Sequence, residues 1–259
     1  MGTRMSTWRR ITKFNAVGGA GVLTYQLVVR PWMRRWGATD EEVTAALPGD
    51  ELVRRLDAQS THAVTIAAPP EAVWPWIVQM GQDRGGLYSY LWVENALLRL
   101  GFRNADRIVP EWQDLKVGDR IWFVPEHYAT SRFGPVVMAI DPPRSLILSM
   151  GVPDQPCPGT WQFILRQRSD GDTRLLLRSR ASAEAPLAMR VMNAVMEAGY
   201  FVMERRMLLG IKERAERTAI AESSGVVADH ERSNIAPWPL GDTTSFPHVE
   251  STLTDAAAR

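Results

Sequence analysis

The sequence predicts an α+β domain in which a curved antiparallel sheet wraps around one long C-terminal helix. Two observations lead to this fold class. Between Gly118 and Ser182 the chain consists of short extended runs bounded by Gly, Pro or Asp, which is typical of consecutive antiparallel strands. A helical pattern then runs from Pro186 to about Arg217, longer than an average helix, so it must cover something large.

A short capped helix precedes the sheet. Thr39-Asp40-Glu41-Glu42 is a capping box, in which the Thr hydroxyl accepts an orphan N–H and Glu42 reaches back to the N-cap. Pro48-Gly49 is expected to end this helix. A β-rich run, Thr61 to Ala67, then predicts the first strand.

Two further helices are predicted after that strand. Pro69-Pro70 can open a helix, because the missing N–H of proline would be unpaired there anyway. Pro75 lies further inside this helix and predicts a kink, and Gly81 is the expected stop. After the loop at Gly85-Gly86, a second helix is expected over residues 89–100.

Five extended runs follow these helices. Ser169-Asp170-Gly171-Asp172 carries the Asp-Gly signal of a tight hairpin. Alternation after this turn predicts that Leu175 and Leu177 face inward. The same rule places Trp161, Phe163 and Leu165 together on one face. The runs are Arg120–Val124, 132–140, Ser145–Met150, Thr160–Gln167 and Thr173–Ser182.

Composition excludes several classes of protein. At 259 residues and 45% hydrophobic, the chain can bury a full core in one main domain with tails. Its 30 basic and 29 acidic residues leave a charge of +1, so no nucleic-acid partner is expected. The single Cys157 excludes an internal disulfide and sites of two or more thiolates. Without a metal cluster, a P-loop or a complete dinucleotide fingerprint, we expect no metal and no cofactor.

The N-terminus is the membrane candidate of the chain. Residues 1–36 hold seven basic residues and no acid. They include a charge-free stretch, Phe14 to Val29, flanked by Trp8 and Trp32. This pattern favours an uncleaved segment that contacts the membrane through residues 8–36, by aromatic anchoring and attraction to anionic lipid. Spanning the membrane, lying on it and folding back onto the domain all remain open, so the expected location is cytoplasmic or membrane-associated.

Six motifs carry a resemblance to a known superfamily. They are Trp36-Gly37-Ala38-Thr39, Leu47-Pro48-Gly49-Asp50, Ala68-Pro69-Pro70-Glu71-Ala72-Val73-Trp74-Pro75-Trp76, Gln79-Met80-Gly81-Gln82-Asp83-Arg84-Gly85-Gly86-Leu87-Tyr88-Ser89-Tyr90, Glu94-Asn95 and Val117-Gly118-Asp119. With them the chain resembles the START-like SRPBCC superfamily, in a bacterial branch similar to polyketide cyclases and dehydrases. The resemblance implies the helix-grip fold.

The resemblance and the tails together divide the chain into four parts. The predicted division is 1–36, a basic and apolar N-terminal segment; 37–60, a capped short helix and linker; 61–217, the START-like domain; and 218–259, a disordered tail rich in Ser, Thr, Asp and Pro.

The resemblance also implies a cavity between the sheet and the long helix that holds a lipid, quinone or polyketide-like molecule. The helix is rich in Met, which adapts to irregular shapes. Aromatic side chains after the glycine loop suit the mouth of such a pocket. Ordinary core packing is the alternative for each of these residues. The predicted ligand-binding residues are Trp76, Met80, Tyr88, Tyr90, Trp92, Trp161, Phe163, Leu175, Leu177, Met192, Met196 and Met203.

Catalysis needs convergent polar groups, and the sequence offers few. No hydrolase or metalloprotease motif is present. Tyr90, Glu94 and His127 are the only candidates for acid–base chemistry, and no residue is assigned as catalytic. The first hypothesis is therefore a non-catalytic binder or carrier of a hydrophobic small molecule. The alternatives are a cyclase or dehydratase that uses the same cavity and an interaction module that acts through its tails.

Overall fold

The computed structural model describes residues 21, 23–90, 103–126, 133–151 and 156–223. By its backbone contacts the chain divides into residues 1–220 and a short second unit, 221–259, of which only the end of the last helix is described. In chain order the elements are η1 Tyr25–Val29, α2 Arg30–Arg34, α3 Asp40–Thr44, η2 Asp50–Leu52, β1 Leu56–Ile66, α4 Pro70–Val78, η3 Pro110–Trp112, β2 Val136–Asp141, β3 Ser145–Ser149, β4 Gly159–Gln167, β5 Thr173–Ser182 and α6 Leu187–Ser223.

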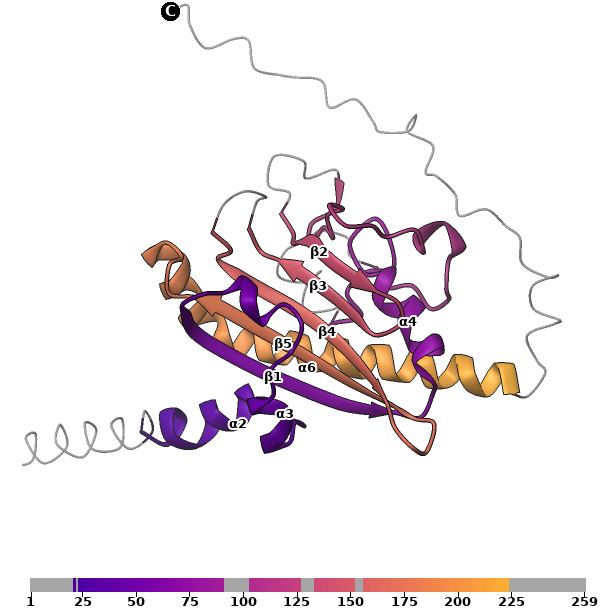
Figure 1. Cartoon of the computed structure of the whole chain (residues 1–259), viewed down its shortest axis with the longest axis horizontal. Helices are drawn as coiled ribbons and strands as arrows, with labels where there is room; N and C mark the ends of the chain where they lie inside the picture. The colour runs from indigo at the N-terminus through magenta and orange to yellow at the C-terminus, as the bar shows by residue number, and fades with distance from the viewer. Residues whose placement is uncertain (1–20, 22, 91–102, 127–132, 152–155, 224–259) are drawn as a thin grey trace, which may run out of the picture. The chain divides into compact units, whose positions relative to one another are not determined.

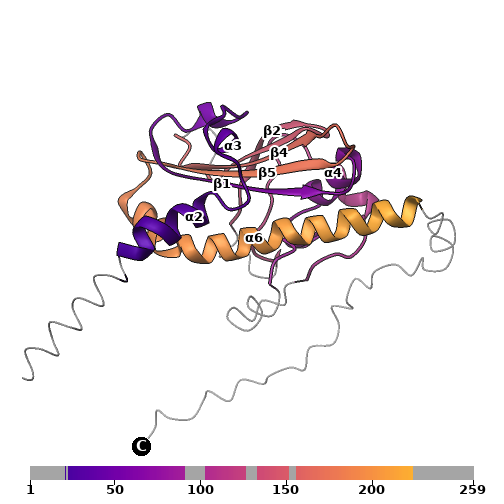
Figure 2. The same cartoon turned by 90° about the horizontal axis from the view of Figure 1, so that it is seen from below.

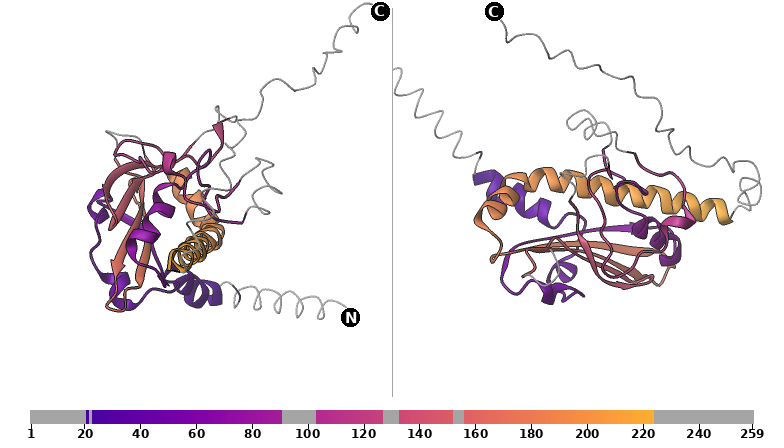
Figure 3. Two further views of the ribbon diagram at one scale, coloured as in Figure 1. Left: turned by 90° about the vertical axis from the view of Figure 1, so that its right-hand side faces the viewer. Right: turned by 90° about the horizontal axis from the view of Figure 1, so that it is seen from above.

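The five strands form one antiparallel sheet in the order β1-β5-β4-β3-β2 (Figure 1). Strands β2 to β5 are a meander, and β1 adds to its far edge by pairing with β5. The long helix α6 runs across one face of the sheet, whereas α3 lies over the other (Figure 2). The two views of Figure 3 show the same layering along and across α6. This is the expected α+β helix-grip fold.

Alternation along the strands separates two sets of buried side chains. Leu175, Leu177 and Phe163 belong to the main core, which lies between the sheet, α4 and the second half of α6. Leu176 and Ile164 face the other way, into a smaller cluster with Leu47. The inward orientation predicted for Leu175 and Leu177 is therefore confirmed, and so is the shared face of Trp161, Phe163 and Leu165.

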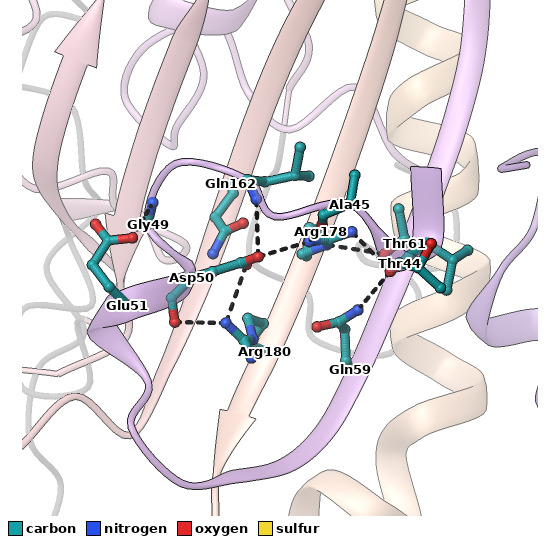
Figure 4. Close-up of polar contacts among 12 residues, drawn as sticks. Thr44, Ala45, Gly49, Asp50, Glu51, Gln59, Thr61, Gln162, Arg178 and Arg180 are labelled. Carbon is teal, nitrogen blue, oxygen red and sulfur yellow. Dashed lines mark hydrogen bonds and ion pairs between the residues drawn. The ribbon is translucent and has the colours of Figure 1, made fainter. Parts of the chain in front are cut away.

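Residues 37–53 cover the sheet face opposite α6, and a buried arginine attaches them. The Arg178 guanidinium on β5 is 1% exposed and donates to the carbonyl oxygen of Ala45 at 2.7 Å and to Asp50 Oδ2 at 2.8 Å (Figure 4). It also donates to Thr61 Oγ1 and to the carbonyl oxygens of Glu42 and Val43. Because these five bonds satisfy the whole guanidinium, its burial is compensated.

Two glycines explain motifs that the sequence analysis singled out. Gly37 has φ +74°, and a Cβ there would lie 2.1 Å from the carbonyl oxygen of Ala63. Gly49 has φ +90°, and a Cβ there would lie 2.5 Å from Ile147 Cγ2 on β3. Both positions need glycine for a left-handed backbone and for close approach to the sheet.

The capping box is confirmed, although its helix is shorter than expected. Thr39 Oγ1 accepts from the backbone N–H of Glu42 at 3.2 Å, and Glu42 Oε2 accepts from the backbone N–H of Thr39 at 2.8 Å. The helix ends at Thr44, before Pro48-Gly49. The Asp-Gly hairpin is also confirmed, because Gly171 has φ +90° in the turn between β4 and β5.

The strand expected over Arg120–Val124 is wrong. Among the described residues this segment makes only a single bridge, from Arg120 to Val136. Its Ile121 N–H donates to the carbonyl oxygen of Pro135, but Pro135 has no N–H to return the bond. The Phe123 N–H still donates to the carbonyl oxygen of Phe133 at 2.9 Å, so the two segments remain in contact, but the bond that Pro135 cannot return prevents a regular two-way ladder.

The observed ends of the helices differ from the predicted ends. The long helix continues six residues past Arg217, to Ser223. The helix predicted over 89–100 lies almost entirely in the segment 91–102, outside the described residues, and so does most of the tail predicted from 218. In the described part of the chain, no helix has the length and apolar character needed to cross a membrane.

Candidate functional site

A histidine and a glutamate meet beneath α6, on the sheet face that it covers. His62 on β1 pairs with Leu177 on β5, so it shares the inward face of that leucine. Its Nδ1 atom lies 3.0 Å from Oε2 of Glu204 on α6. The side chains are only 2% and 12% exposed. The two atoms are in contact, but the geometry at Nδ1 does not meet the requirements of a hydrogen bond.

The other oxygen of Glu204 accepts two hydrogen bonds from the sheet. Trp161 Nε1 on β4 and Ser179 Oγ on β5 each donate to Oε1 at 2.9 Å. These donors are neighbours, because Trp161 and Ser179 pair directly across β4 and β5. The carboxylate is therefore held by side chains from three strands while its own backbone belongs to α6.

The hydrogen-bond partners of the two imidazole nitrogens indicate that a proton lies between His62 and Glu204. His62 Nε2 lies 2.9 Å from the carbonyl oxygen of Met33, which can only accept, so Nε2 carries a hydrogen. A neutral imidazole would then present a lone pair at Nδ1 to a carboxylate oxygen. Two acceptors at 3.0 Å repel, so one proton is held on Nδ1 or on Oε2.

Aromatic rings enclose this pair on the side of α2. The His62 ring contacts Phe201 of α6 edge-on, with centroids 5.6 Å apart, and Phe201 also contacts Trp32 and Trp36. Partial burial, and after it the negative charge of Glu204, raises the pKa of the nearby Tyr200. The pair is thus a polar group in an aromatic setting, where charges interact more strongly than in water.

A second buried polar cluster fixes the glycine loop. Gln79 is fully buried, and its Nε2 donates to Tyr88 Oη at 3.1 Å and to the carbonyl oxygen of Arg107. Burial raises the pKa of Tyr88, whose ring lies 4.8 Å from the Arg214 guanidinium. Gly210 on α6 lets the helix approach this loop, because a Cβ there would lie 2.5 Å from the carbonyl oxygen of Tyr88. This cluster positions the loop, and its polar groups bind one another.

The predicted ligand-binding residues fall into three groups. Met192 and Met196 are exposed on the first half of α6, and Met203 and Tyr90 are half-buried. Trp92 lies outside the described residues. The remaining predicted residues are buried in the main core: Trp76, Met80, Tyr88, Trp161, Phe163, Leu175 and Leu177.

The three candidates for acid–base chemistry are not brought together in the described structure. Glu94 and His127 lie outside the described residues. Tyr90 is described and half-buried, and it lies near Arg206, whose pKa is raised mainly by the hydrogen bond to Glu213. Within the described part of the chain, no group of three His, Cys, Asp or Glu side chains is arranged to hold a metal ion.

Sequence reasoning missed the pair of His62 and Glu204, although a signal existed. His62 alternates in phase with Val64 and Ile66, the apolar face of the first strand. Glu204 lies seven residues after Glu197 on the same side of an otherwise apolar helical stretch. The two residues could not be paired from the sequence, because the way in which α6 packs on β1 depends on the tertiary structure.

Comparisons with known proteins give weak likenesses in structure alone. No protein-family profile matches the chain, and no curated protein matches it. A protein from Nitrosomonas europaea shares 13% identity, with a TM-score of 0.40 over 66% of this chain and 99% of that one. A protein from Mesorhizobium loti shares 16% identity, with a TM-score of 0.36 over 62% and 98%. The Aha1 dimer from Colwellia psychrerythraea shares 14%, with a TM-score of 0.35 over 62% and 97%.

Proposed function

We propose that the protein binds a hydrophobic small molecule between its sheet and α6, as a START-like member of the SRPBCC superfamily. One observation carries the proposal: the Glu204 carboxylate is held by Trp161 and Ser179 inside an otherwise apolar interior. Apolar surroundings with a few convergent polar groups are what a small-molecule site requires. The ligand class is a lipid, quinone or polyketide-like molecule, whose polar group would bond to His62 and Glu204.

Native mass spectrometry of the protein from its own host tests this function. We expect one apolar compound per chain, released on denaturation. Glu204→Gln should lower its occupancy, whereas Glu213→Gln should not, because Glu213 lies on the same helix in an exposed pair with Arg206. An empty protein that also takes up no compound from a panel of lipids, quinones and polyketides would overturn the proposal.

A second candidate function is a cyclase or dehydratase that acts on a polyketide-like substrate. The observation in its favour is the proton held between His62 and Glu204, because such a reaction needs a group that can give up or accept a proton at the substrate. For this function, His62→Gln should abolish turnover of a polyketide substrate and leave its binding unchanged. Binding without turnover in the unmodified protein would favour the carrier.

A further inference from the structure

The first half of α6 has its charged side chains turned toward the protein and its apolar side chains toward the outside. Between Leu187 and Met203 the only charged residues are Arg190 and Glu197. Arg190 binds Asp57 at 2.8 Å, and Glu197 binds Arg30 at 2.7 Å and also Arg34. The outward face carries Leu187, Val191 and Val195, which are 71%, 55% and 72% exposed. A helix of a water-soluble surface has the opposite polarity.

Residues 23–34 show the same reversal beside it. Their two charged residues, Arg30 and Arg34, both turn to Glu197 of α6. Most outer positions are apolar, with Leu27 at 72% and Trp32 at 54% exposure and Leu23 and Val28 also exposed, whereas Thr24 and Gln26 are the exposed polar residues. Trp32 contacts Phe201 of α6, which fixes the two helices side by side. The two helices therefore present one continuous apolar surface. We call Leu23, Leu27, Val28, Trp32, Leu187, Val191, Val195 and Val202 the outer apolar face.

The charge around this face selects its occupant. Arg30 and Arg34 are neutralised by Glu197, but residues 1–22, which lead into this face at Leu23, carry four further basic residues and no acid. A second copy docked face to face would bring two such basic segments together, which costs free energy. An anionic lipid surface would instead attract them, and an exposed Trp beside Arg is the pattern of a side chain at the headgroup boundary.

We propose that the outer apolar face docks on an anionic lipid bilayer, with α6 lying in the plane of the membrane surface. The contact then joins residues 23–34 to the first half of α6. Leu187 to Val202 span about 22 Å of helix at about 1.5 Å per residue, enough for several side chains to enter the headgroup boundary together. The binding is therefore interfacial and sensitive to lipid charge.

Vesicle sedimentation of the full chain tests the proposal. We expect binding to vesicles of phosphatidylcholine with phosphatidylglycerol, weakened by salt and by omission of the anionic lipid. Val195→Glu should raise the lipid concentration for half-binding about tenfold, because it places a charge on the docked face. Val117→Glu is the matched control, since Val117 is 61% exposed in a turn whose Gly118 bonds to β2. Equal binding by the two variants would overturn the proposal.

A site-specific probe separates lipid docking from self-association. With Cys157→Ser as background, a polarity-sensitive dye is attached through Val195→Cys or through Val117→Cys. The dye at position 195 should shift to the blue when vesicles are added, whereas the dye at 117 should not. A shift at 195 that rises with protein concentration without lipid, together with a dimer in light scattering, would assign the face to a second copy and overturn the proposal.

Discussion

His62 on β1 and Glu204 on α6 face each other with Nδ1 and Oε2 3.0 Å apart, at the point where the edge strand and the long helix meet. The contact joins an element near the start of the domain to the element at its end. It also gives the interior a charged group whose partners are fixed by the sheet.

The protonation of this pair can be read from the ring nitrogens of His62. Two hydrogen bonds to Oε1 favour the carboxylate form of Glu204, so we expect the hydrogen between the two groups to lie on Nδ1 of His62, opposite Oε2. Glu204→Gln should leave one protonated nitrogen, because the amide can donate to Nδ1. Long-range proton–nitrogen NMR of the side chain distinguishes the two states.

Glu213→Gln is the control for that measurement. Its carboxylate binds Arg206 on the exposed side of α6, so the His62 signals should not move. A hydrogen on Nε2 alone in the unmodified protein would contradict this location of the hydrogen.

The pH dependence of stability should include a contribution from Glu42. Its hydrogen bonds with Arg174 lower the pKa of this carboxyl below the ordinary value of 4.5. A carboxyl whose pKa is lowered by folding stabilises the protein above that ordinary value, and the contribution is lost as the pH falls through the folded pKa. We expect Glu42→Gln to cost about 2 kcal/mol at neutral pH.

Urea unfolding from neutral pH to about pH 3 checks this expectation. The amide keeps an oxygen for the capping bond to Thr39, but its NH2 group cannot accept from Arg174 Nε, so the variant removes the charge and one hydrogen bond. The difference between the variant and the unmodified protein should shrink below pH 4.5. A difference that stays constant across this range would show that the charge of Glu42 contributes nothing.

Gly49 and Gly171 separate backbone strain from steric conflict. Both have φ +90°, but a Cβ at Gly49 would lie 2.5 Å from Ile147, whereas nothing lies within 4 Å at Gly171. We expect Gly171→Ala to cost about 1 kcal/mol and Gly49→Ala about 3 kcal/mol in the free energy of unfolding. Equal losses would show that the loop moves away from β3 without cost.

The five bonds of Arg178 should make it intolerant of lysine. An ammonium cannot reach Thr61, Asp50 and the carbonyl oxygen of Ala45 together, so buried acceptors would lose partners. We expect Arg178→Lys to lower the free energy of unfolding by about 3 kcal/mol. Arg166→Lys is the control, because Arg166 is exposed on the neighbouring strand β4 and should change it by less than about 0.5 kcal/mol. Hydrogen exchange in residues 37–53 would locate the damage.

Local signals predicted most of the sheet and the helix that it grips. Alternation places Leu175 and Leu177 correctly because a strand has two faces and one is buried. The segment Arg120–Val124 is also mostly apolar, but whether it forms a regular ladder depends on Pro135, fifteen residues further along the chain than Arg120. The composition of one segment does not reveal that the neighbouring segment lacks a backbone N–H, here that of Pro135.

The site was less predictable for the same reason. Met192 and Met196 fit a lining stripe by spacing, yet the structure exposes them, since helical spacing does not tell which side of α6 faces the sheet. That side is marked by Glu197 and Glu204, whose partners come from α2, β1, β4 and β5. A search for buried charge on an apolar helix would have been more informative than a search for an apolar stripe.

The strand order has a consequence for the newly made chain. Because β1 pairs with β5, residues 56–66 have no partner in the sheet until residues 173–182 have left the ribosome. Strands β2 to β5 can pair in order as they emerge, whereas β1 must wait through the synthesis of the whole meander. During that interval its apolar residues are the part of the chain that chaperones would have to protect.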